Sequence, residues 1–168
     1  MTLPDMATRL GSARPSAPRT AVALLLLTLT LAHGGSSTPA IAVIVGRHQA
    51  PAMQLPQTLV LGIFARKRQL WDDGSTIVPV NLPAAHPLRR DFSIWVFKRT
   101  PEDMQDYWND QYFHGVLPPP VLGSEEAVLR FVASTPGSIG YVSSCSVDKR
   151  VDVVALIQSP DGASPCPH

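Results

Sequence analysis

The sequence contains few of the residue patterns that mark metal sites or catalytic sites. It has two cysteines, no Cys-x-x-Cys pair, and five histidines, none of which has another histidine two or four positions away. The spacing of a structural zinc site is therefore absent, and we expect no metal and no other cofactor. A Gly-x-Ser-x-Gly elbow and a Gly-x-x-x-x-Gly-Lys loop are also absent, so we predict that the protein is not an enzyme.

The sequence also lacks an excess of charge of either sign. Its 168 residues include 14 Lys and Arg against 13 Asp and Glu, a net charge of +1 at pH 7, and residues 41–168 alone carry −1. Binding to nucleic acid requires a concentrated basic surface. We therefore expect no nucleic-acid partner.

The sequence has no apolar run long enough to cross a membrane as a helix. The run Ala21–Ala32 has about 12 residues, whereas a spanning helix needs about 20. Arginines precede this run and small residues follow it, which is typical of a secretory signal peptide. We predict a signal peptide over residues 1–40, cleaved between residues 32 and 40, and a periplasmic location. An uncleaved membrane anchor is the alternative.

Export would place Cys145 and Cys166 in an oxidising compartment, where an even number of cysteines favours a disulfide. This bridge would tie the C-terminal tail to the rest of the domain. The alternative is two free thiols, because Cys166 lies in a Pro- and Ser-rich segment, residues 159–168, which we expect to be flexible. The sequence alone leaves both alternatives open.

Residues 41–158 alternate between patterns typical of strands and of helices. β-branched runs predict strands, whereas apolar faces with capping residues predict helices. We predict strands at Ile41–Val45, Thr76–Asn81, Ile139–Val142 and Val151–Ile157, and helices at Pro56–Arg68, Pro87–Lys98, Thr100–His114 and Glu125–Ala133. This alternation indicates an α/β fold, with a small mixed β-sheet flanked by helices.

Three of these segments allow finer predictions. The β-branched run Ile41–Val45 is typical of a buried strand that is central or parallel. Pro79 has no N–H group, so its position must face an edge or a gap in the sheet. The aromatic stripe over residues 104–113 is typical of a helix face that packs into the core.

Three stretches resemble the periplasmic phosphate-binding proteins of ABC importers, which are type II periplasmic binding proteins. Leu59–Asn81 is similar to the family's helix, Trp-x-Asp-Gly turn and strand, and Arg89-Arg-Asp-Phe92 is similar to its Arg-x-x-Phe at a helix start. The most specific match is Gly123–Val142, which includes Thr135-Pro-Gly-Ser-Ile-Gly-Tyr-Val142. A full member has two lobes with the anion in the cleft between them. The resemblance implies that residues 41–158 form a single lobe.

The chain departs from the family at the phosphate loop, which reads Ser-Gly-Thr-Arg before x-x-Phe. Here His86, Pro87 and Leu88 precede Arg89, so both hydroxyl donors are missing and Pro87 has no N–H to offer. The resemblance therefore implies weak or degenerate binding of phosphate or another small anion. The candidate ligand residues are Asn81, His86, Arg89 and Ser124.

Each candidate also has an ordinary structural explanation. The helix starts at residues 86–90 and 123–126 could hold an anion through free N–H groups, but Ser124 is equally an N-cap, followed by two glutamates that would repel an anion. Arg89 could form a bidentate pair with an oxyanion, or lie solvated or ion-paired on the surface. His86 could become charged near neutral pH, or simply face water.

Two functions are compatible with these features. The first is an exported solute-binding module related to the phosphate-binding component of ABC importers. The second is an envelope interaction or accessory protein that kept the lobe and lost the ligand. In that case exposed aromatics and the proline-rich segment Val116–Val121 would dock a second copy, as a homodimer, or another envelope protein.

Overall fold

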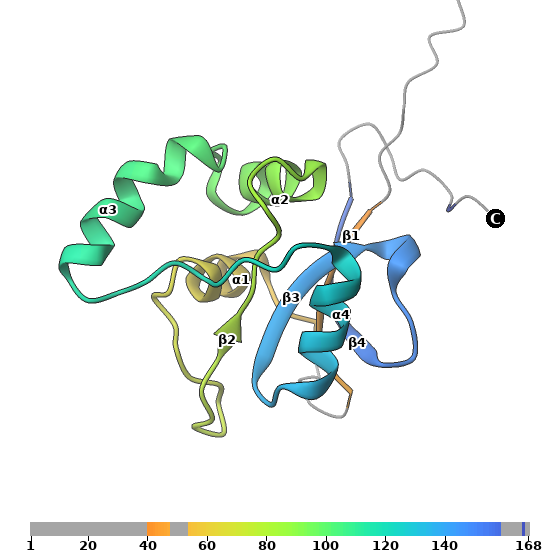
Figure 1. The fold of residues 1–168 in the computed structure, drawn as a ribbon. Coiled ribbons are helices and arrows are strands. Elements are labelled where there is room, and N and C mark those ends of the chain that lie inside the picture. The colour runs from red at the N-terminus through yellow and green to blue at the C-terminus, as the bar shows by residue number, and fades with distance from the viewer. Residues whose placement is uncertain (1–39, 48–53, 159–165, 167–168) are drawn as a thin grey trace, which may run out of the picture. The chain divides into compact units, whose positions relative to one another are not determined.

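The structure is a computed structural model that describes residues 40–47, 54–158 and 166, all within one compact unit, residues 34–168. The predicted signal peptide and most of the predicted tail lie outside the described residues. In chain order the elements are β1 (Ile41–Gly46), α1 (Gln57–Phe64), β2 (Val78–Pro79), α2 (Pro87–Phe97), the 3-10 turn η1 (Glu102–Met104), α3 (Gln105–Phe113), α4 (Glu125–Ser134), β3 (Ser138–Ser143), the 3-10 turn η2 (Ser144–Ser146) and β4 (Val151–Ile157) (Figure 1). The predicted α/β fold is confirmed.

The four strands form one mixed sheet in the order β2-β3-β1-β4. Strand β1 is antiparallel to both β3 and β4, whereas β2 is parallel to β3. The central position predicted for β1 is confirmed, but the parallel alternative is wrong. Its continuous apolar run instead reflects burial on both faces, since all six of its residues are buried.

Strand β2 is an edge strand, as Pro79 requires. The N–H groups of Val78 and Val80 donate to Gly137 and Ile139 at 3.0 and 2.9 Å. Pro79 lies between them with its nitrogen on the other side, where no ladder bond is needed. The strand is shorter than predicted, because Asn81 leaves β3 and instead pairs in parallel with Val121.

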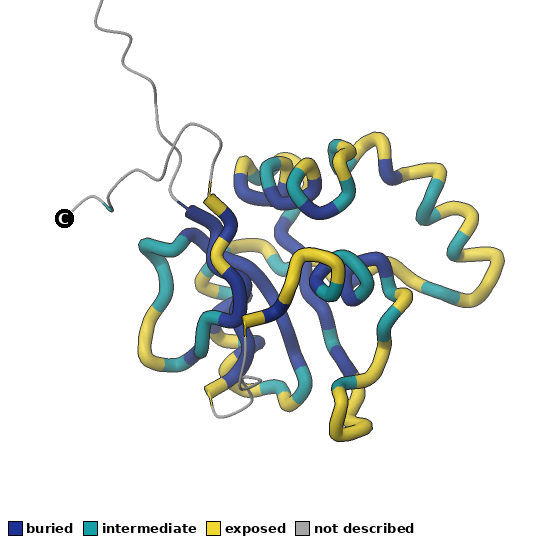
Figure 2. Tube along the Cα trace, turned by 180° about the vertical axis from the view of Figure 1, so that it is seen from behind, coloured by how far each residue is buried: buried dark blue, intermediate teal, exposed yellow. Residues whose placement is uncertain are grey.

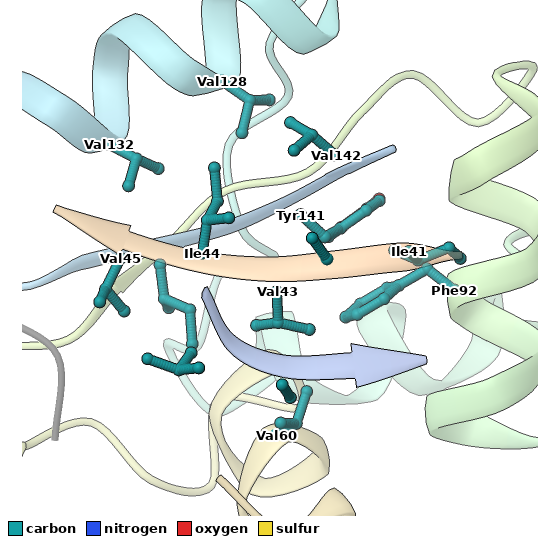
Figure 3. Close-up of a cluster of buried hydrophobic side chains, with 14 of the residues drawn as sticks. Ile41, Val43, Ile44, Val45, Val60, Phe92, Val128, Val132, Tyr141 and Val142 are labelled. Atoms are coloured by element: carbon teal, nitrogen blue, oxygen red, sulfur yellow. The ribbon is translucent and has the colours of Figure 1, made fainter. Parts of the chain in front are cut away.

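The core fills both faces of the sheet. Side chains of neighbouring residues in a strand point to opposite faces, and in β1 Ile44 lies toward Val128 and Val132 of α4, whereas Val43 lies toward Val60 of α1 (Figure 3). All five side chains are at most 1% exposed. The sheet is therefore enclosed between α4 on one face and α1 on the other.

Helix α3 does not join this core, contrary to the prediction for the aromatic stripe. Met104 just before it is buried, but no residue within α3 is. Tyr112 and Phe113 are 65% and 85% exposed, and the exposed part of the chain around α3 stands out in Figure 2. The helix is held to the body through Tyr107, whose hydroxyl donates to the carbonyl of Ala65 at 2.8 Å. The stripe has the right spacing for a buried face, but no element of the described chain covers its end.

A disulfide joins Cys145 to Cys166, with the two Cα atoms 5.3 Å apart. Cys145 lies in η2, directly after β3. The bridge therefore fixes a point of the C-terminal segment beside the end of β3, where Ser143 pairs with Ile41 of β1.

Candidate functional site

Asn81, Arg89 and Tyr141 form a buried polar cluster. Asn81 follows β2, Arg89 lies in the first turn of α2, and Tyr141 belongs to β3. Arg89 Nη1 donates to Asn81 Oδ1, and the Tyr141 hydroxyl donates to the same oxygen at 3.4 Å. The Tyr141 oxygen in turn accepts the backbone N–H of Leu82 at 3.3 Å. Two distant parts of the sequence, residues 81–89 and Tyr141, thus meet at one carbonyl oxygen.

The backbone of Asn81 is fixed independently of its side chain. Its N–H donates to the carbonyl of Pro120 and its carbonyl accepts from Leu122, both at 2.8 Å. The side-chain amide has one possible orientation, because a guanidinium carries only donors and must face the amide oxygen. The Nδ2 amino group of Asn81 is therefore left as a donor, and it has no hydrogen-bond partner within the part of the chain that the structure describes.

The contact with Asn81 uses only one nitrogen of the Arg89 guanidinium. The guanidinium also lies beside the Tyr141 hydroxyl, which takes a side-chain hydrogen bond from Arg89. Its Nε and Nη2 nitrogens, which share one edge of the guanidinium, have no other hydrogen-bond partner among residues 40–47, 54–158 and 166. In those ranges Ser93 Oγ is the side-chain atom that is both fully enclosed and unpartnered. The Arg89 edge and Asn81 Nδ2 therefore still reach the surface.

The charge of Arg89 is not balanced by a carboxylate. Arg89 is 7% exposed, and it forms no ion pair with any residue in the described ranges. The exposed arginines differ, since Arg68 pairs with Asp72 and Arg150 pairs with Glu126. A buried charge without a counter-charge is costly, so Arg89 depends on Asn81 Oδ1 and on its remaining exposure to solvent.

The neighbouring phenol is held in its neutral form. Burial raises the pKa of Tyr141 above its ordinary value of 10.0, and the positive charge of Arg89 opposes that rise only in part. Tyr141 therefore remains a hydrogen-bond donor at neutral pH, and the surroundings of Asn81 Oδ1 consist of donors only.

The start of α2 carries no free backbone donors, contrary to the expectation for residues 86–90. His86 is the N-cap, and its Nδ1 accepts the N–H of Leu88 at 3.3 Å. Pro87 has no N–H, and those of Arg89 and Arg90 donate to the His86 carbonyl at 2.9 and 3.2 Å. His86 thus takes the donors that an anion would use.

At the start of α4, the side chains of Ser124, Glu125 and Glu126 are each engaged with other parts of the chain. Ser124 is the N-cap, accepting the N–H of Ala127 at 3.2 Å, so the capping role is confirmed. Glu125 accepts the N–H of Ser143 at 2.7 Å, and Glu126 binds Arg150. No hydrogen bond links Ser124 to the cluster of Asn81, Arg89 and Tyr141 within the described residues. The structure brings together two of the four candidates.

Tyr141 was not among the site residues predicted from the sequence. A polar signal was present, because Tyr141 carries the one hydroxyl that projects from the middle of the apolar stretch Ile139–Val142. Its partner Asn81 lies 60 positions earlier. The two meet only because β2 pairs with β3, which local sequence does not reveal.

No group of three or more His, Cys, Asp or Glu side chains in the described ranges could hold a metal ion. Among the same residues, no helix is long and apolar enough to span a membrane.

The fold is similar to part of the solved structures of two phosphate receptors. The chain is similar to an ABC-type phosphate transport receptor from Vibrio cholerae, with a TM-score of 0.56 and 19% identity over 70% of this chain and 46% of that one. It is also similar to a phosphate ABC transporter substrate-binding protein from Clostridium perfringens, solved with bound phosphate, with a TM-score of 0.57 and 20% identity over 70% of this chain and 45% of that one. The chain thus spans about half the length of these structures. The sequence matches no protein-family model and no curated protein.

Proposed function

We propose that this chain is an exported solute-binding module that captures a small anion at Arg89. The observation that carries the proposal is the guanidinium of Arg89, a residue that is 7% exposed. It has no carboxylate partner in the described residues, and its Nε and Nη2 edge is not used by Asn81. The fold adds support, because the two solved structures named above are a phosphate transport receptor and a substrate-binding protein with bound phosphate. The module acts by binding and does no covalent chemistry.

The proposed site is weak for phosphate. The start of α2 supplies no backbone N–H, because Pro87 lacks one and His86 accepts the others. What remains is side-chain donors from Arg89 and Asn81. The chain spans about half the length of the matched receptors, and weak binding is what these few donors support.

Isothermal titration calorimetry with phosphate tests this proposal. We expect saturable binding with a dissociation constant in the millimolar range, roughly −4 kcal/mol, and its loss in Arg89→Met. Arg90→Met is the matched control, because Arg90 lies on the same turn, is exposed, and has Glu102 at 3.8 Å. Micromolar binding would contradict the weak site, and binding that survives in Arg89→Met would contradict the assignment of Arg89.

One observation favours an interaction protein as the second candidate function. Helix α3 has no buried residue, and Tyr112, Phe113, Leu117 and Val121 are 61–85% exposed. We propose, as the alternative, that this aromatic arm docks a second copy of the chain and that the anion site is vestigial.

Light scattering after size-exclusion chromatography separates the two candidates. The alternative predicts a dimer that becomes monomeric in Phe113→Ser. Glu102→Gln, in the turn η1 directly before α3, is the control. A monomer at all concentrations, together with an anion titration that depends on Arg89, would contradict the alternative.

A further inference from the structure

We infer that the ligand of the Arg89 site is a small, singly charged carboxylate and not a phosphate. This inference rests on the proposed anion-binding function and specifies the chemistry of its ligand. It comes from the donors that the cluster still offers, from their total charge and from how little of Arg89 and Asn81 is exposed. Each of these can be derived from named contacts.

The donor edge of Arg89 that Asn81 does not use has the shape that fits a carboxylate. Arg89 Nη1 is committed to Asn81 Oδ1, which leaves Nε and Nη2. Two parallel N–H groups on this edge match the two oxygens of a carboxylate in a bidentate pair. Asn81 Nδ2, whose orientation Arg89 dictates, supplies a further donor from the same cluster. Two oxygens can therefore be satisfied.

The start of α2 offers no further donors that could satisfy the additional oxygens of a phosphate. A phosphate has four oxygens, and any oxygen that is desolvated without a donor costs free energy. At the start of α2, Leu88 donates to His86 Nδ1, and Arg89 and Arg90 donate to the His86 carbonyl. These N–H groups are unavailable, so a phosphate would leave oxygens unpaired where a carboxylate would not.

The positive charge at the site matches that of a monoanion. Arg89 supplies one positive charge, and the next cation on α2, Arg90, is exposed and lies 3.8 Å from Glu102. His86 could add a second charge only if its Nδ1 were protonated, and the contact with Leu88 N–H would then be lost. A single guanidinium neutralises a monoanion, whereas a dianion would leave one charge uncompensated beside buried groups.

The burial of Arg89 and Asn81 limits the size of the ligand. Arg89 and Asn81 are 7% and 4% exposed, so only a small group reaches their free donors. This favours a free carboxylate of a few atoms over the side chain of a folded partner.

NMR titration of the uniformly ¹⁵N-labelled full chain tests the inference, with the Arg89 Nε–H signal as the probe. The signal is identified by its absence in Arg89→Lys, which keeps the charge but lacks the donor edge. Acetate, sulfate and phosphate are compared at equal ionic strength and at about pH 8, where phosphate is largely a dianion. We expect a saturable shift with acetate, and at least about tenfold weaker responses to sulfate and phosphate.

The possible outcomes distinguish this inference from the function beneath it. Phosphate or sulfate binding as tightly as acetate would overturn the carboxylate inference and leave the proposed anion-binding function standing. No saturable shift with any of the three anions would overturn both. The comparison is made within the wild-type chain, so it does not depend on whether Arg89→Lys folds. If that variant does not fold, the backbone N–H of Leu82, which donates to Tyr141, serves as the second probe.

Discussion

The rings of Phe92 and Tyr141 stack face to face, with their centroids 3.8 Å apart and their planes 8° from parallel. Phe64 packs edge-on against Phe92, with centroids 4.7 Å apart. The Tyr141 ring thus belongs to the aromatic core between α2 and β3, while its hydroxyl extends into the polar cluster at Asn81. The two halves of one side chain serve packing and the site, and they can be separated by mutation.

Tyr141→Phe keeps the stack and removes only the hydroxyl. The N–H of Leu82 then loses its acceptor, and we expect a loss of about 1–2 kcal/mol in the free energy of unfolding. Urea unfolding followed by circular dichroism measures the loss. Tyr112→Phe is the matched control, because Tyr112 is 65% exposed, and we expect no change there. Equal effects in the two variants would contradict a specific role for the buried hydroxyl.

Asn81→Asp should replace the external anion with an internal one. The new carboxylate would face Arg89 Nη1 in place of the amide oxygen and would neutralise the guanidinium. We expect the thermal stabilisation that added anions give the wild-type chain to disappear, because ligand stabilisation depends on binding to the folded state. Differential scanning fluorimetry with and without acetate measures this. Stabilisation of the variant equal to that of the wild type would show that the anion binds elsewhere.

The backbone at Gly137 lies close to the backbone at Thr76, and a substitution at Gly137 tests this contact. It has φ +76°, and a Cβ there would lie 2.2 Å from the carbonyl oxygen of Thr76. Gly74 has a similar φ of +84° with no neighbour within 4 Å. Gly74→Ala should therefore cost about 1 kcal/mol from backbone strain alone, and Gly137→Ala roughly 1–3 kcal/mol more. Urea unfolding of the two variants isolates the steric part, and equal losses would contradict it.

Much of the fold could be predicted from the sequence because its signals are local. The β-branched run of β1, the proline of β2 and the serine cap of α4 each indicate structure within a few residues. Helix α3 shows where this reasoning stops. Periodicity identified an aromatic stripe over residues 104–113, but it could not show whether another element covers its C-terminal end, where Tyr112 and Phe113 are exposed.

The candidate site was predicted less completely. Asn81 and Arg89 were named from the sequence, and the structure joins them. The capping contact of His86 and the hydrogen bond of Tyr141 were not predicted. The first depends on a rotamer and on which ring nitrogen carries the proton. The second depends on strand order, and neither is encoded in a local pattern.

The disulfide between Cys145 and Cys166 should contribute strongly to stability. It closes a segment with a sequence separation of 21 residues, and the chain-entropy estimate for a loop of this length is about 3 kcal/mol. We expect a reductant to lower the urea midpoint of the wild-type chain. The Cys145→Ser, Cys166→Ser double variant should already have the lower midpoint and should not respond. A reductant effect that persists in the double variant would rule out the bridge as its cause.

The ion pairs at the start of α4 should make stability depend on pH. Hydrogen bonds from Arg150 lower the pKa of Glu126 below its ordinary value of 4.5, and the same arginine lowers the pKa of Asp148 below 3.8. A carboxylate whose pKa is lower in the folded than in the unfolded chain adds stability above the unfolded value. That stability is lost as the pH falls from about 4.5 through the folded pKa.

The destabilisation caused by Glu126→Gln should therefore be largest at neutral pH and should vanish in acid, where the wild-type carboxyl group is itself protonated and resembles the amide. Urea midpoints of the two chains, measured between neutral pH and about pH 3, test this. Glu102→Gln is the control, because Glu102 makes a single contact with Arg90 at 3.8 Å among the described residues, and surface pairs of that kind contribute little. A Glu126→Gln difference that stays constant across the range would mean that the Arg150 contacts do not stabilise the ionised carboxylate, and that α4 is held to β4 by packing alone.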